Sequence, residues 1–106
     1  MTTEIERRIV TALVNALIGA GYRLCVSDLE EEERNLIPIL SDAKAVLNGM
    51  FDRDEECLIL FREGSDPVAG IRLVYGNGSD VVSDLTDMPE IVAIVDQVME
   101  DLEAAP

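Results

Sequence analysis

The tripeptide Gly76-Asn77-Gly78 stands between two short apolar segments, residues 69–75 and 80–85. Asn-Gly tolerates positive φ at both central positions of a two-residue turn, so this arrangement is typical of a tight β-hairpin. A hairpin joins antiparallel strands, whereas parallel strands need a long crossover connection. The sequence therefore predicts an antiparallel sheet in the C-terminal half of the chain.

Three further segments are candidate strands. Residues 22–27 alternate in polarity, which puts Tyr22, Leu24 and Val26 on one face. Residues 57–62 are almost continuously apolar, which indicates a central strand or one covered on both faces. Residues 35–40 could pair with 22–27, but Pro38 cannot donate to a ladder and would restrict this strand to an edge or a bulge.

Helical periodicity occurs three times. Residues 3–19 carry apolar side chains at intervals of three and four, and Gly19 and Gly21 supply the stop. Ser41 is the expected N-cap of a second helix that runs to residue 51. Asp87 and Glu90 open the third helix in the pattern of a capping box. Its expected buried stripe comprises Ile91, Ile94, Val95, Val98 and Leu102.

These elements follow the order α-β-(β)-α-β-β-β-α, and the connections between them are short. Short connections and hairpin turns favour an antiparallel sheet with helices packed on it. The sequence predicts one α+β domain over residues 1–106, with three helices and a four- or five-stranded, mainly antiparallel sheet.

The net charge of the chain indicates which kinds of partner it can bind. The chain has 22 acidic and 8 basic residues and a net charge of −14, and Arg72 is its last basic residue. Such a field repels nucleic acid and anionic membranes and attracts basic surfaces. We therefore expect a basic protein surface as the partner, with no direct nucleic-acid or membrane binding.

Catalysis and metal binding are disfavoured. The chain has no histidine, which removes the commonest general base and metal ligand, and its 4% aromatic content leaves few rings to stack a sugar. Four acids fall at calcium-loop spacing, but Cys57 takes the place of the required glycine within a predicted strand. We expect neither catalytic residues nor a metal or cofactor. The four acids are Asp52, Asp54, Glu56 and Glu63.

The sequence shows no pattern typical of a targeting signal. The N-terminal segment does not resemble a signal peptide, and no apolar run is long enough to span a bilayer. We therefore expect a cytoplasmic protein, in which Cys25 and Cys57 are buried thiols in a reducing compartment.

The segment from Tyr75 to Thr86 carries a resemblance. Its order is Tyr-Gly-Asn, then Gly-Ser, then Asp-Val-Val-Ser-Asp-Leu-Thr. This segment, with Ser41-Asp42 and Asp54-Glu55 upstream, resembles a family of small acidic uncharacterised accessory proteins of proteobacterial plasmids and phages. Ser79 departs from the pattern, since an aromatic residue is usual there. The resemblance implies a gene carried by a mobile element.

Three groups of carboxylates are the candidate partner-binding residues. Asp80 and Asp84 alternate with Val81 and Ser83, so they are expected on the face of Val82. Acids at i, i+4 and i+7 of the last helix repeat at about 5 to 6 Å, close to the phosphate spacing along a nucleic-acid strand. The third group is a run of four glutamates. The helix acids are Asp96, Glu100 and Glu103, and the run is Glu30, Glu31, Glu32 and Glu33.

Two functional hypotheses follow. The first is a non-catalytic acidic binding protein that inhibits a host defence nuclease, in the manner of an anti-CRISPR or anti-restriction protein, by imitating nucleic acid. The alternative is a regulatory or structural interaction module that forms a homodimer through Val92 and Met99 on the last helix.

Overall fold

A computed structural model describes residues 4–27, 41–51, 55–62, 67–76 and 81–104. Its three helices are α1 (Glu4–Gly19), α2 (Ala43–Asn48) and α3 (Pro89–Ala104). The four strands are β1 (Arg23–Ser27), β2 (Glu55–Phe61), β3 (Pro67–Val74) and β4 (Val82–Leu85). The sheet has the order β1-β2-β3-β4 with every neighbouring pair antiparallel, which confirms the predicted α+β fold. The candidate strand at 35–40 and the turn at 77–80 lie outside the described residues.

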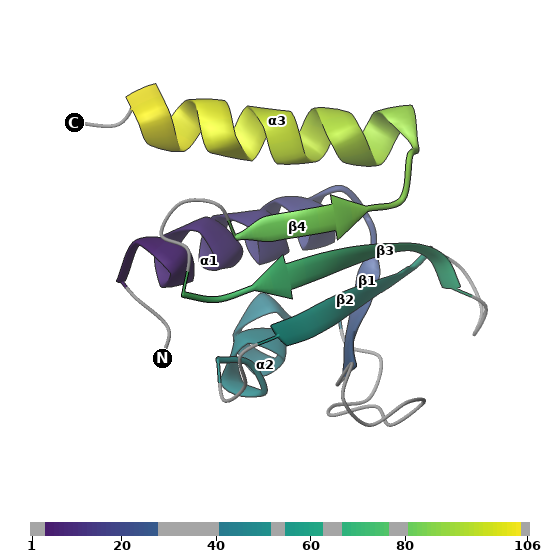
Figure 1. The fold of residues 1–106 in the computed structure, drawn as a ribbon. Helices are drawn as coiled ribbons and strands as arrows, with labels where there is room; N and C mark the ends of the chain where they lie inside the picture. The colour runs from purple at the N-terminus through teal and green to yellow at the C-terminus, as the bar shows by residue number, and fades with distance from the viewer. Residues whose placement is uncertain (1–3, 28–40, 52–54, 63–66, 77–80, 105–106) are drawn as a thin grey trace.

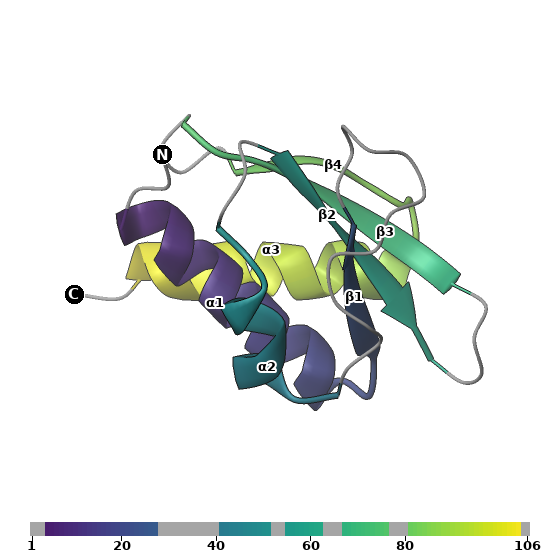
Figure 2. The same cartoon turned by 90° about the horizontal axis from the view of Figure 1, so that it is seen from below.

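The helices cover one face of the sheet (Figures 1 and 2). Helix α1 packs against α2, α3 and β1, while α3 runs along the side of the sheet where β4 lies (Figure 1). We call the sheet face that meets the helices the inner face and the opposite one the outer face.

Strand alternation decides which residues enter the core. Leu58 and Leu60 on β2 are fully buried, whereas Cys57 and Ile59, which alternate with them, are only half-buried on the outer face. The same alternation places the apolar residues of the neighbouring strands on the inner face, as the sequence predicts. The fully buried inner-face residues of β1 and β3 are Leu24, Val26, Ile71 and Leu73.

The end of α1 confirms the predicted glycine stop. The Tyr22 N–H donates to Leu17 O, and the Gly21 N–H donates to Ile18 O. Together these bonds form a Schellman motif, which requires a left-handed residue after the helix. Gly21 supplies it with φ of 100°.

Helix α2 differs from the prediction at both ends. The N-cap is Asp42, whose side chain accepts from the Lys44 N–H at 3.2 Å, so the expected Ser41 cap is wrong by one residue. The helix ends at Asn48 rather than continuing to Phe51. Phe51 cannot extend it, because its φ is 76°.

Helix α3 begins one residue later than a cap at Asp87 requires. Pro89 is the first helical residue, and the Val92 N–H donates to Met88 O. The predicted capping box is therefore wrong. The carboxylate of Glu90 is used elsewhere, because it binds the side chains of Tyr22 and Arg62.

A register shift in the β3–β4 pair corrects the predicted faces of β4. Val82 lies opposite Leu73, but Asp84 lies opposite Arg72 because the register shifts between Arg72 and Leu73. Val82 therefore faces the core, while Asp84 lies on the outer face with Arg72. The expectation that Asp84 shares a face with Val82 is wrong, since the irregularity breaks simple alternation.

Candidate functional site

The solvent-exposed side of α3 is acidic. Asp96 and Glu100 are exposed, and they lie four residues apart, so their side chains share one helix face about 6 Å apart along the axis. Asp101 is also exposed and accepts a hydrogen bond from Gln97 Nε2 at 2.8 Å. Glu103 lies in the last turn of α3, and its side chain falls outside the described part.

Asp84 does not join this surface. Asp84 lies on the outer face of the sheet, which points away from the helices, so the structure separates it from Asp96 and Glu100. Asp80 and the run from Glu30 to Glu33 lie outside the described residues.

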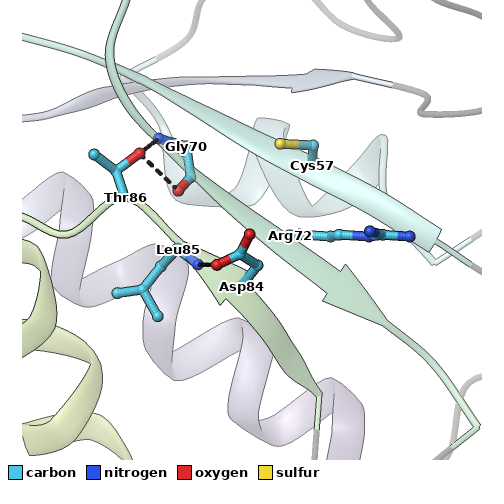
Figure 3. Close-up of a pocket in the computed structure, with 6 residues that line it drawn as sticks. All are labelled: Cys57, Gly70, Arg72, Asp84, Leu85 and Thr86. Atoms are coloured by element: carbon cyan, nitrogen blue, oxygen red, sulfur yellow. Dashed lines mark hydrogen bonds between the residues drawn. The ribbon is translucent and has the colours of Figure 1, made fainter.

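Asp84 borders a shallow hollow of about 290 Å³ on the outer face (Figure 3). We call this the Asp84 hollow. Gly70 has no side chain, so the strand backbone is open to the hollow at this position. The lining residues are Cys57, Gly70, Arg72, Asp84, Leu85 and Thr86.

Hydrogen bonds fix the rim of the hollow. The Leu85 N–H donates to Asp84 Oδ1 at 2.9 Å, which holds the carboxylate against its own strand. The Gly70 N–H donates to Thr86 Oγ1 at 2.9 Å, and the Thr86 N–H donates to Gly70 O at 3.0 Å. These bonds extend the β3–β4 pairing one residue beyond β4 and order the side chains around the cavity.

Arg72 is opposite Asp84 in register but pairs with a different carboxylate. Its Nη2 donates to Glu55 Oε2 at 2.8 Å, and both side chains of this pair are partly exposed. In Figure 3 the guanidinium points along the sheet, away from Asp84. Glu55 thus neutralises Arg72, and Asp84 contributes a net charge of about −1 at the hollow.

Among the residues that the structure describes, two glutamates are fully buried, a feature that the sequence analysis missed. Glu56 Oε1 accepts from the Tyr75 hydroxyl at 2.8 Å and from the Phe51 N–H at 2.9 Å. Glu6 Oε2 accepts from the Gly76 N–H at 2.5 Å. Each carboxylate accepts from the N–H of a residue with positive φ, since Phe51 and Gly76 have φ of 76° and 102°. This cluster therefore fixes backbone geometry at one end of the sheet.

Aromatic packing surrounds the same cluster. The rings of Phe51 and Tyr75 are 5.9 Å apart between centroids, and the guanidinium carbon of Arg7 lies 4.8 Å from the Phe51 centroid. Burial raises the pKa of Tyr75, the negative charges of Glu56 and Glu6 raise it further, and Arg7 opposes them. Tyr75 thus stays protonated and donates to Glu56.

Patterns in the sequence could have indicated both glutamates. Glu6 stands three and four residues before Ile9 and Val10, so it belongs to the apolar stripe of α1. Glu56 alternates with Leu58 and Leu60, which puts it on the inner face of β2. The signal was the position of each acid on an apolar face.

A second polar cluster joins α3 to the sheet. Glu90 accepts from the Tyr22 hydroxyl at 2.6 Å, and the Arg62 guanidinium donates to both Glu90 oxygens at 3.0 and 3.2 Å. The Tyr22 hydrogen bond and the Arg62 guanidinium lower the pKa of Glu90, while burial raises the pKa of Tyr22. This arrangement anchors the start of α3.

Both cysteines lie on the outer face, and neither forms a disulfide. Cys25 is buried, and Cys57 is half-buried beside Gly70. Burial raises the pKa of both thiols, although Arg72 opposes the shift at Cys57. A thiol with a raised pKa is a weak nucleophile at neutral pH, because the thiolate is the reactive form.

Comparisons with family models, with curated proteins and with solved structures gave no match for this chain. Across the described residues, no helix is both long and apolar enough to cross a lipid bilayer. Groups of three or more potential metal-ligating acidic, cysteine or histidine side chains are likewise not found among the described residues.

Proposed function

We propose that this chain is a non-catalytic acidic binding protein that docks its carboxylates onto the basic surface of a partner protein. The observation that carries the proposal is that Asp96, Glu100 and Asp101 are all exposed to solvent on the single helix α3. No basic residue follows Arg72 in the sequence, and Arg72 itself is paired with Glu55. Helix α3 therefore has no basic residue of its own that would offset its negative charge.

The partner class that fits this surface is a protein built to hold nucleic acid. Its groove is lined by lysine and arginine, and it accepts negative charges at regular spacing. Together with the resemblance to accessory proteins of plasmids and phages, this supports an inhibitor of a host defence nuclease as the function. The acidic helix would occupy the groove in place of DNA or guide RNA.

Homodimerisation through α3 receives less support. Val92 and Met99 are only partly exposed, and Met99 packs against the core. The exposed large hydrophobic residues in the described part are Ile5 and Val68, which lie on α1 and β3. These positions do not form an apolar face on α3.

Titration of the purified chain against purified restriction enzymes and CRISPR effector complexes tests the proposal. We expect a complex at low salt that weakens as salt rises and that DNA displaces, because both ligands compete for one basic groove. Absence of binding to every effector at low salt would refute the inhibitor function. Concentration-dependent dimers in light scattering, without effector binding, would favour the interaction module instead.

A further inference from the structure

The Asp84 hollow is a second candidate contact, separate from the acidic surface of α3. Asp84 is exposed at its rim, while Arg72, the basic residue among those that line it, is held by Glu55 at 2.8 Å and points away (Figure 3). The hollow therefore presents one carboxylate beside an open stretch of backbone and a half-buried sulfur. We propose that it receives the side chain of an arginine from the partner protein.

The size of the hollow fits a single side chain. Sites for whole small ligands occupy roughly 300 to 1,000 Å³ and bury most of the ligand surface. A shallow hollow of about 290 Å³ lies just below that range. Cys57 makes part of its wall apolar, which suits the methylene stem of a long basic residue whose charged head meets Asp84.

The hydrogen-bond acceptors favour arginine over lysine. Asp84 is oriented in advance by the Leu85 N–H, so its carboxylate loses little conformational freedom when it binds a cation. Thr86 Oγ1 lies at the same rim and, within the described residues, accepts only one hydrogen bond there, from the Gly70 N–H, so it adds a neutral acceptor. A guanidinium has five donors and is weakly hydrated, so it can use several acceptors at once where an ammonium acts as a point charge.

This inference deepens the proposed function, because it rests on a basic partner and names one residue type that the partner must supply. It places a second contact on the outer face of the sheet, apart from the α3 surface. A partner that uses both contacts would wrap around the side of the molecule where β4 and α3 lie.

The test uses a small probe and needs no partner. N-acetyl-arginine methylamide is titrated into the ¹⁵N-labelled chain, with the neutral N-acetyl-citrulline methylamide as the control probe. We expect saturable shifts of the Gly70, Leu85 and Thr86 amides with a Kd on the order of 1 mM for the arginine probe only. Asp84→Asn should weaken binding at least tenfold, and its amide oxygen can still accept from the Leu85 N–H.

Two matched variants separate the hollow from general acidity. Gly70→Val fills the hollow without changing the charge, and it should also weaken binding at least tenfold. A Cβ atom at Gly70 meets its nearest neighbours at 3.7 to 4.0 Å, which is ordinary van der Waals contact, so there is space for it. Asp96→Asn removes the same charge from α3 and should leave the shifts unchanged. Equal binding of the citrulline probe, or equal losses in the Asp84→Asn and Asp96→Asn variants, would overturn the arginine site. Either result would leave docking through α3 intact, since effector binding is measured separately.

Discussion

Tyr75 donates a 2.8 Å hydrogen bond to Glu56 inside the core, where Glu56 belongs to β2 and Tyr75 directly follows the neighbouring antiparallel strand β3. The same Glu56 oxygen accepts from the Phe51 N–H, so one buried carboxylate joins the end of β3 to the segment that follows α2. The contact is central to stability because a buried carboxylate that loses a donor is costly.

Tyr75→Phe should destabilise the fold by about 2 kcal/mol, since it removes a buried hydrogen bond to an acidic group and keeps the ring packing. Urea unfolding followed by circular dichroism measures the change. Tyr22→Phe is the matched control, because its partner Glu90 is exposed and the lost bond can be replaced by water. A loss for Tyr75→Phe no larger than that for Tyr22→Phe would show that the buried cluster contributes little.

Alkaline pH should unfold the protein as its tyrosines ionise. Burial raises the pKa of both Tyr22 and Tyr75, and these are the two tyrosines of the chain. A raised folded-state pKa gives stability that is fully present below the unfolded value of about 10 and is lost as pH rises further. We expect tyrosinate absorbance to appear together with the loss of the circular dichroism signal. Ionisation near pH 10 in a chain that keeps its native spectrum would contradict the buried positions.

Much of the fold follows from local patterns. The Asn-Gly hairpin signal and the short connections predict antiparallel pairing, and the apolar stripes predict the buried sides of α1 and α3. Gly21 ends α1 as expected because a Schellman motif needs positive φ at that residue. These features depend on residues close together in the chain, so the sequence is sufficient for them.

The remaining features depend on distant partners. Glu6 accepts from the Gly76 N–H across 70 residues, and no local pattern identifies that donor. The shift that moves Asp84 to the outer face arises from pairing with β3, so alternation within β4 misplaces it. Glu90 fits a capping box by spacing, but Tyr22 and Arg62 bind its carboxylate. Of the predicted partner-binding acids, Asp96 and Glu100 lie together and exposed as expected.

Salt should stabilise the chain. With a net charge of −14, repulsion among the carboxylates opposes the compact state. The Debye length falls from about 30 Å at 0.01 M to about 10 Å at 0.1 M salt, so sodium chloride screens this repulsion. Calorimetry should show a melting temperature that rises across this range. A flat or falling melting temperature would indicate that the acids are too dispersed to form a strongly negative surface.

The α3 surface is tested by reversing its charge. Lysine at positions 96, 100 and 103 changes the local charge by six units, enough to turn attraction for a basic groove into repulsion. Asp96 and Glu100 are exposed, so each of these two substitutions should alter stability by no more than about 0.5 kcal/mol. The matched control reverses three acids of the glutamate run. The test variant is Asp96→Lys, Glu100→Lys and Glu103→Lys, and the control is Glu30→Lys, Glu31→Lys and Glu32→Lys.

The decisive measurement is competition for a DNA-binding defence effector that the wild-type chain binds at low salt. Fluorescence anisotropy follows the release of labelled DNA as each variant is added. Docking through α3 predicts that the wild-type chain and the glutamate-run control displace the DNA, while the folded α3 variant does not. Displacement by the α3 variant as effective as that by the wild-type chain would contradict the proposed surface, and loss in the control alone would assign the contact to the run from Glu30 to Glu33.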